Sequence, residues 1–343
     1  MSTIGIVSYR LGGADGVSIE AAKWKAAISS LGFSVREIAG EGPEHVIAIE
    51  SLRIDSTDPV DVDQLDEALN GLDLVIVENL CSLPLNPSAS EAVAHALQGR
   101  PAILRHHDLS WQRPDTAHFG PPPTDPLWQH VTINQRSRDE LATRDILATC
   151  LYNRFEMNPL PGDRHLARTD AGIDADALVV LQPTRALLRK NIPGGLALAE
   201  SLGATYWLTA AAEDGYGPTL DELLQGARVQ VVRGQGPGTI NDVYAASDIV
   251  VLPSLWEGFG NPVIESVTHR KPLALGNYPV AQELLAFGFQ FFSPLQPQPL
   301  QDFLADPDEE LLEENLEIAH THFDIADLPS VLDDLFASSA LGI

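Results

Sequence analysis

Two glutamates, Glu257 and Glu265, frame a loop whose chemistry suits a sugar or a phosphate. They follow the apolar stretch Ile249–Leu252, in a segment that turns through two glycines into a predicted helix. Asn261 is predicted as the N-cap of this helix and Pro262 as its first residue. The exposed amides of a helix start carry partial positive charge, which favours phosphate or sugar hydroxyls. An ordinary strand-to-helix connection with two solvated glutamates is the alternative interpretation.

Two cations, Arg185 and Lys190, could serve the same ligand. They follow the apolar stretch Ala177–Leu181, and the whole chain has only four lysines. Paired cations can neutralise the charge that builds on a departing diphosphate, a task that metal ions often perform. The alternative is a basic surface turn, although cations are unfavourable at a helix start.

A histidine and a glycine-rich turn in the first half are further candidates. His107 follows the predicted strand Ala102–Arg105, and ligands of parallel sheets bind at the carboxyl ends of strands. A lone histidine there is also compatible with a structural role. The turn after the first predicted strand contains Gly12, Gly13 and Gly16, where the backbone can approach a ligand closely. Their spacing does not match the dinucleotide fingerprint, which argues against a nicotinamide dehydrogenase.

Short apolar stretches alternate with helical patterns along the whole chain, which predicts α/β domains with mostly parallel sheets. The densest cluster of helix and strand breakers, Asn158–Asp163, is the predicted boundary between domains of residues 1–160 and 161–315. Residues 316–343 are predicted as a helical tail. The predicted strands are Ile4–Ser8, Phe33–Ile38, Val46–Ile49, Leu74–Glu78, Ala102–Arg105, Val131–Ile133, Leu178–Gln182, Thr205–Leu208, Val229–Val232, Ile249–Leu252 and Pro272–Leu275.

The composition excludes several classes of protein. A chain of 343 residues, 44% of them hydrophobic, has enough apolar material for two cores. The net charge of −27 disfavours binding to nucleic acid or to an anionic membrane. No apolar run is long enough to span a bilayer, and the N-terminal residues are predicted as a first strand rather than as a signal peptide. Two cysteines, Cys81 and Cys150, suit a reducing cytoplasm. No convincing metal-ligand spacing is visible.

The segment that contains Glu257 and Glu265 resembles the E-x7-E element of retaining glycosyltransferases of family 4, and Arg185 with Lys190 resembles the phosphate-binding pair of that family. The resemblance covers nearly the whole chain and implies the GT-B fold, with two Rossmann-like domains facing across a cleft and the tail crossing back onto the first domain. It implies these roles: catalytic residues His107, Arg185, Lys190 and Glu257, and donor-binding residues Gly12, Gly13, Gly16, Gly258, Phe259, Gly260 and Glu265.

The implied reaction moves a hexose from a nucleotide diphosphate sugar, of the GDP-mannose or UDP-glucose type, to a small soluble hydroxyl acceptor. No tightly bound cofactor and no divalent metal is expected. The sequence around Arg105–Arg113 and around Gln182–Lys190 is similar to that of bacterial mannosylglucosylglycerate synthases. Arg270 and Lys271 depart from the family, which often has glycine there, and leave the sugar undefined. A nucleotide-sugar epimerase or a silent nucleotide-sugar-binding protein remains an alternative, and the oligomeric state is open.

Overall fold

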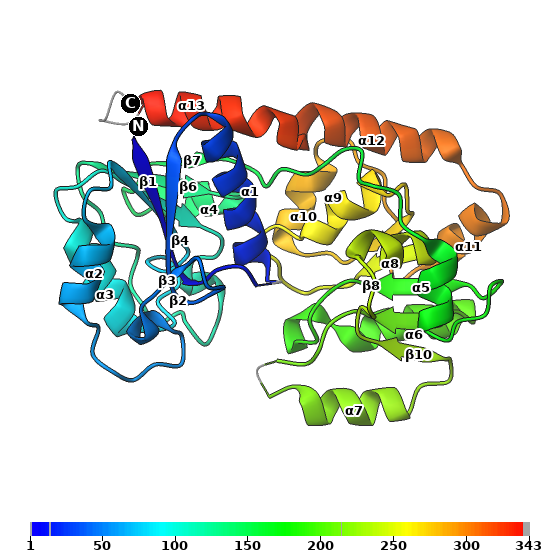
Figure 1. The fold of residues 1–343 in the computed structure, drawn as a ribbon. Helices are drawn as coiled ribbons and strands as arrows, with labels where there is room; N and C mark the ends of the chain where they lie inside the picture. Colours follow the sequence, from blue (N-terminus) through cyan, green and yellow to red (C-terminus); the bar gives the residue numbers. More distant parts are fainter. Residues whose placement is uncertain (1, 14, 214, 339–343) are drawn as a thin grey trace. The chain divides into compact units, whose positions relative to one another are not determined.

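The computed structural model describes residues 2–13, 15–213 and 215–338 and consists of two compact units (Figure 1). Unit 1 contains Met1–Arg154 together with Ala326–Ile343, and unit 2 contains Phe155–Ile325. The last five residues of the predicted tail, 339–343, lie outside the described part of the chain. Each unit is built on its own parallel sheet, which confirms the predicted α/β class.

Unit 1 has a seven-stranded sheet in the order β3-β2-β1-β4-β5-β6-β7. Helices α2 and α3 cover one face of this sheet (Figure 1), where their leucines and valines pack on alternate strand residues. The strands are β1 (Thr3–Arg10), β2 (Ser34–Glu41), β3 (Ile47–Ala48), β4 (Leu74–Glu78), β5 (Ala102–His106), β6 (Trp128–Thr132) and β7 (Ala148–Cys150), and the α-helices are α1 (Gly16–Ser30), α2 (Val62–Leu69), α3 (Pro87–Leu97), α4 (Gln135–Ala142) and α13 (Leu328–Ser338).

Unit 2 has a five-stranded parallel sheet in the order β10-β9-β8-β11-β12. Its strands are β8 (Val179–Gln182), β9 (Thr205–Leu208), β10 (Val231–Arg233), β11 (Ile249–Leu252) and β12 (Leu273–Leu275). Its α-helices are α5 (Arg164–Asp170), α6 (Ile192–Leu202), α7 (Gly217–Gln225), α8 (Ile240–Ala246), α9 (Asn261–Thr268), α10 (Pro279–Leu285), α11 (Pro297–Ala305) and α12 (Glu309–Phe323). The eleven predicted strands all have counterparts in the structure, and β7 is the strand that the sequence did not indicate.

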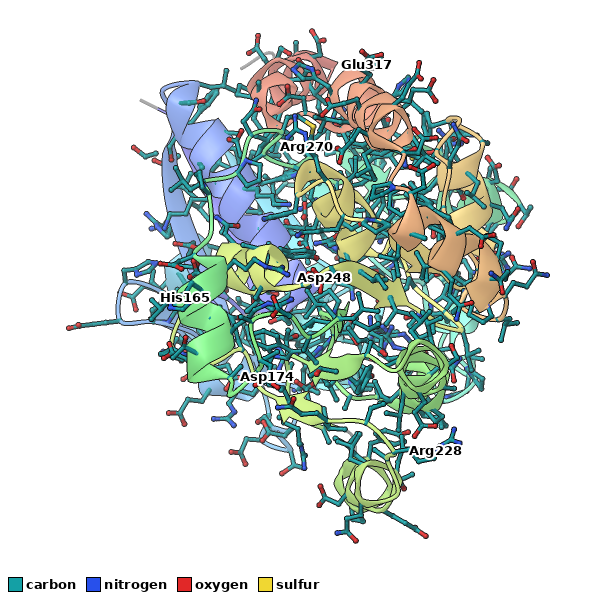
Figure 2. All side chains as sticks on the ribbon, turned by 90° about the vertical axis from the view of Figure 1, so that its right-hand side faces the viewer. His165, Asp174, Arg228, Asp248, Arg270 and Glu317 are labelled. Carbon is teal, nitrogen blue, oxygen red and sulfur yellow. The ribbon has the colours of Figure 1, made fainter. Side chains whose placement is uncertain are left out.

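One carboxylate, Asp248, ties helix α5 to the amino ends of the central strands of unit 2. It accepts hydrogen bonds from Arg164 (2.7 Å) and Arg168 (2.9 Å) of α5 and from the backbone N–H of Val179 (2.9 Å). Figure 2 shows Asp248 beside α5, on which His165 is labelled. Because this end of the sheet is occupied by structural ion pairs, the opposite, carboxyl end of the strands remains for ligands.

Helix α9 ends at a strained residue. The N–H of Lys271 donates to the carbonyl of Ser266 (2.8 Å) and that of Arg270 to the carbonyl of Val267 (2.9 Å), which is the Schellman arrangement. Arg270 therefore takes the position that glycine usually fills, and its φ is +50°. Its guanidinium binds Glu313 of α12 at 2.7 Å, and Figure 2 shows Arg270 between these two helices.

Candidate active site

The predicted strand-loop-helix of unit 2 is formed by β11 and α9. Helix α9 begins at Asn261, with Gly260 rather than Asn261 as its N-cap and Pro262 as its second residue, so the predicted N-cap was wrong by one position. The reason lies in Gly260, whose φ of +96° allows the sharp entry into the helix. A side chain at Gly260 would collide with the Tyr278 hydroxyl, because an added Cβ would lie 2.4 Å from it. That hydroxyl donates to the carbonyl of Phe259 at 3.0 Å.

The loop between β11 and α9 contains Glu257, which is only 5% exposed and accepts four hydrogen bonds. Lys190 Nζ donates to both carboxylate oxygens, at 2.5 and 2.7 Å. Ser254 Oγ donates at 2.6 Å and Arg189 Nη1 at 3.1 Å. Burial alone would raise the pKa of Glu257, but the opposing charges of Lys190 and Arg189 bring it below its ordinary value. Glu257 is therefore an ionised carboxylate held in a fixed orientation.

The two predicted cations make different contacts. Lys190 belongs to the Glu257 cluster, whereas Arg185 Nη1 donates to Glu213 at 2.6 Å, a partly exposed ion pair. A backbone bridge between Ala186 and Ala212 brings Glu213 to this place. The pKa of Lys190 is lowered, mainly by burial. The charge of Glu257 opposes this shift, and the charges of Arg189 and Arg185 add to it. Arg189, which the sequence did not single out, is the second cation on Glu257.

The remaining donor-site candidates lie on the same loop and helix. Glu265 is half-buried on the second turn of α9, and its Oε2 accepts a hydrogen bond from the Tyr244 hydroxyl at 2.9 Å. The side chain of Phe259 is buried against Phe155 and Phe323, so only its backbone is available to a ligand. Gly258 lies between Glu257 and Phe259 in the connection.

In unit 1, His107 follows β5 and belongs to a buried polar cluster. His107 Nε2 contacts Glu78 Oε2 at 2.7 Å, and the backbone N–H of His107 donates to Asn79 Oδ1 at 3.0 Å. Glu78 is fully buried at the end of β4. Burial would raise the pKa of Glu78, but Arg105 and His107 lower it below its ordinary value. The sequence reasoning missed Glu78, although a carboxylate that closes an otherwise apolar strand was a usable signal.

Arg105 is the buried cation that links the members of this cluster. Its Nη1 donates to Glu78 at 3.2 Å, and its Nη2 contacts Glu20 at 3.4 Å and Asn153 at 3.2 Å. The guanidinium lies 4.2 Å from the centre of the Trp24 ring, a cation–π arrangement. The groups that hold His107 are therefore buried and fixed by several contacts.

The three glycines of the first turn differ in what the backbone demands of them. Gly12 has a φ of +73°, and an added Cβ would lie 2.6 Å from Pro43. Gly13 faces Asp15 and Ser18, whereas Gly16 begins α1 with no atom near an added Cβ. The fold thus requires glycine at position 12, and it leaves position 16 unconstrained.

Across residues 2–13, 15–213 and 215–338, no group of three or more His, Cys, Asp or Glu side chains is arranged to hold a metal ion. None of the helices described has the length and apolar character needed to cross a bilayer.

Known proteins resemble this chain in sequence and in fold. Residues 166–305 match the family model of group 1 glycosyl transferases. The chain is similar to the mannosylglucosylglycerate synthase of Thermotoga maritima, with 24% identity over 96% of this chain and 98% of that protein, and to that of Petrotoga mobilis, with 26% identity over 84% and 86%. Among solved structures, Anabaena HepE in complex with UDP and glucose has a TM-score of 0.75 at 17% identity, covering 98% of this chain and all of that one. The chain thus carries a group 1 glycosyltransferase domain, and it is a glycosyltransferase of the GT-B fold.

Proposed function

We propose that the protein is a retaining glycosyltransferase of family 4, which moves a hexose from a nucleotide diphosphate sugar to a small soluble hydroxyl acceptor. The observation that carries the proposal is the buried cluster of Glu257, Lys190, Arg189 and Ser254 at the carboxyl end of the unit 2 sheet. A carboxylate with two cations and a hydroxyl suits a ligand that presents both phosphate charge and sugar hydroxyls.

On the donor side, we assign the diphosphate to Lys190, Arg189 and Arg185. Lys190 and Arg189 carry two positive charges and share one carboxylate, Glu257. The cluster therefore has a net positive charge that a phosphate can compensate. The Arg185–Glu213 pair is partly exposed and worth only about 0–1 kcal/mol, so an incoming phosphate can compete with Glu213 for the guanidinium. Glu265 is assigned to the ribose, and the backbone of Gly258, Phe259 and Gly260 to the sugar.

The proposed chemistry uses no enzyme carboxylate as nucleophile. Glu257 has its pKa lowered and its oxygens occupied by donors, so it is a poor base and a poor nucleophile. The acceptor oxygen attacks the sugar carbon on the face from which the diphosphate leaves, while the bond to the leaving phosphate oxygen breaks. The acceptor proton passes to that phosphate oxygen, and the anomeric configuration is retained. Lys190 and its neighbouring arginines stabilise the developing negative charge.

In unit 1, we assign His107 to the reacting sugar and the glycine-rich turn with Gly12, Gly13 and Gly16 to the donor. His107 is held by Glu78 and Asn79 in one orientation, which suits contact with the reacting sugar. In this proposal residues 1–160 serve the acceptor, residues 161–315 the donor, and the tail from residue 316 returns to the acceptor domain. We place the reaction in a reducing cytoplasm, which suits a chain with only two cysteines, Cys81 and Cys150.

The two synthase relatives suggest the acceptor class. Their name describes a product in which mannose extends glucosylglycerate, and both relatives align along most of their length with this chain. We therefore propose GDP-mannose with glucosylglycerate as the first pair of substrates to test, and UDP-glucose as the alternative donor.

The test incubates the protein with each donor and acceptor and follows the products by proton NMR. An α-linked product from an α-linked donor, formed only when the acceptor is present, supports the proposal. Activity is expected to persist in EDTA. Inversion at the anomeric carbon, or conversion of the donor without acceptor, would refute it.

Variants of the cluster test the assignment of the cations. Lys190→Ala is expected to lower kcat about 10²–10³-fold, because it removes one donor aimed at the developing charge. Lys271→Ala, which removes a lysine that donates to the carbonyl of Ser247, is the control and should retain wild-type kcat. Unchanged turnover in Lys190→Ala would remove the cluster from the mechanism.

A further inference from the structure

A buried tyrosine lies against the carboxylate that we assign to the ribose. Tyr244 of α8 is 0% exposed, and its hydroxyl donates to Glu265 Oε2 at 2.9 Å. Tyr244 comes from the helix before β11 and Glu265 from the helix after it, so this hydrogen bond links two elements around one strand. The sequence pattern offered no reason to select Tyr244, because a tyrosine on a helix face is a common core residue.

The Tyr244 hydroxyl is a donor at every working pH. Burial, and then the charge of Glu265, raise the pKa of Tyr244 well above its ordinary value. The phenol therefore remains protonated beside the carboxylate. One carboxylate oxygen is thus engaged by a rigid neutral donor, which fixes the plane of the group.

A second ring prevents Tyr244 from turning away. The imidazole of His269 stacks on the phenol ring, with ring centres 4.2 Å apart and planes 15° from parallel. His269 is itself fixed at both nitrogens, by the Glu265 carbonyl at 2.7 Å and by Asn241 Oδ1 at 3.1 Å. The stack therefore joins Tyr244 of α8 to His269, the residue that caps the C-terminus of α9, the helix that carries Glu265.

We infer that Tyr244 is a positioning residue, which orients the Glu265 carboxylate so that it can accept hydrogen bonds from the ribose hydroxyls of the nucleotide. The inference rests on the proposed function, because it requires a ribonucleotide at this site. Its consequence is selective: Tyr244 sets how well the protein distinguishes a ribose from a deoxyribose. If Tyr244 only filled the core, its replacement would change the stability of the protein and leave the ratio of ribose to deoxyribose affinity unchanged.

The experiment measures binding by calorimetry with UDP, GDP and the 2′-deoxy and 3′-deoxy forms of each. Loss of one hydroxyl that bonds a carboxylate is expected to weaken binding to the wild type about 10–100-fold. In Tyr244→Phe this ratio should fall to about 3-fold or less for at least one hydroxyl, mainly through weaker binding of the ribonucleotide. In the enzyme assay the donor KM should rise correspondingly while kcat at saturating donor stays within about twofold.

Tyr206→Phe is the matched control. Tyr206 is equally buried in the same unit, and its hydroxyl donates to the side chain of Gln182 at 2.7 Å. Any change of affinity in this variant should fall equally on ribose and deoxyribose ligands, so the ratio stays at the wild-type value. Glu265→Gln provides a second route that does not depend on the stability of Tyr244→Phe: it should lose the discrimination by itself, and Tyr244→Phe should add nothing in that background.

The outcomes separate this inference from the proposed function. If the wild type distinguishes the ligands and Tyr244→Phe distinguishes them equally well, the positioning role is wrong and the glycosyltransferase proposal stands. If the wild type binds ribose and deoxyribose forms alike, the inference fails with nucleotide binding intact. If none of these nucleotides binds, both the proposed donor site and the inference are overturned.

Discussion

Replacing Lys190 by alanine should destabilise unit 2 by an amount that depends on pH. Lys190 and Glu257 are both buried and share two short contacts, and removing one member of such a pair costs about 3–5 kcal/mol. Glu257 keeps its hydrogen bonds from Ser254 and Arg189, so the lower end of this range, about 3 kcal/mol, is expected. For a domain of this size the change corresponds to a decrease in Tm of about 6–12 °C, measurable by calorimetry at pH 7.

The sign of the pH effect follows from Glu257. Its pKa in the folded protein is below the ordinary value of 4.5, so its stabilising contribution is complete above that pH and is lost as the pH falls through the folded value. Without Lys190 the pKa of Glu257 rises, and most of the contribution is already absent at pH 7. The difference in Tm between wild type and Lys190→Ala should therefore narrow below about pH 4.5.

Lys271→Ala serves again as the control for this measurement. Lys271 donates to a carbonyl and has no carboxylate bonded to it, so its loss should cost about 1 kcal/mol. A Tm for Lys190→Ala equal to that of the control, or a decrease that is the same at pH 4 and pH 7, would show that the buried ion pair is not the source of the stability.

Three further changes test other parts of the description. Glu265→Ala should weaken nucleotide affinity about 10-fold or more while slowing the bound substrate less, and wild-type affinity by titration calorimetry would count against the ribose assignment. Arg270→Gly should raise the free energy of unfolding by about 1 kcal/mol relative to Arg270→Ala, because both lose the exposed pair with Glu313 and only glycine relieves the positive φ; equal urea midpoints would refute the strain. Gly12→Ala should lower the free energy of unfolding in urea by at least about 1 kcal/mol, whereas Gly16→Ala should not. Of these two glycines, Gly12 has the left-handed backbone and a close neighbour in Pro43.

The strands that the sequence predicted best are those buried on both faces. β4, β9 and β11 match their predicted ranges because continuous apolar residues mark the centre of a parallel sheet. β7 was missed because Ala148–Cys150 is a short edge strand that is only partly buried and has no such run. The N-cap of α9 was misplaced because Gly260, with a positive φ, precedes that helix. Glycine has no side chain to form a capping hydrogen bond, so the sequence gives no sign of this N-cap.

The sequence indicated several residues of the candidate site, but it did not indicate which side chains they contact. The spacing indicated Lys190 and Glu257, but they are far apart in the sequence, and only the folded chain brings them to 2.5 Å. Arg185 was predicted to serve the same ligand as Lys190, and nothing in the sequence indicated its present partner, Glu213 on a separate loop. Arg189 and Glu78 were not selected, because their roles depend on contacts across neighbouring strands.

The order of segments along the chain bears on how the protein is made. Helix α13 belongs to unit 1, where it lies against α1 and places Phe336 edge-on to Phe33 at 5.9 Å, yet it is translated after all of unit 2. During synthesis, all of unit 2 is therefore made before α13, the last helix of unit 1. A fragment that stops at Arg154 lacks this cover over α1, so it is expected to expose apolar surface, and excision of unit 1 requires joining its two pieces.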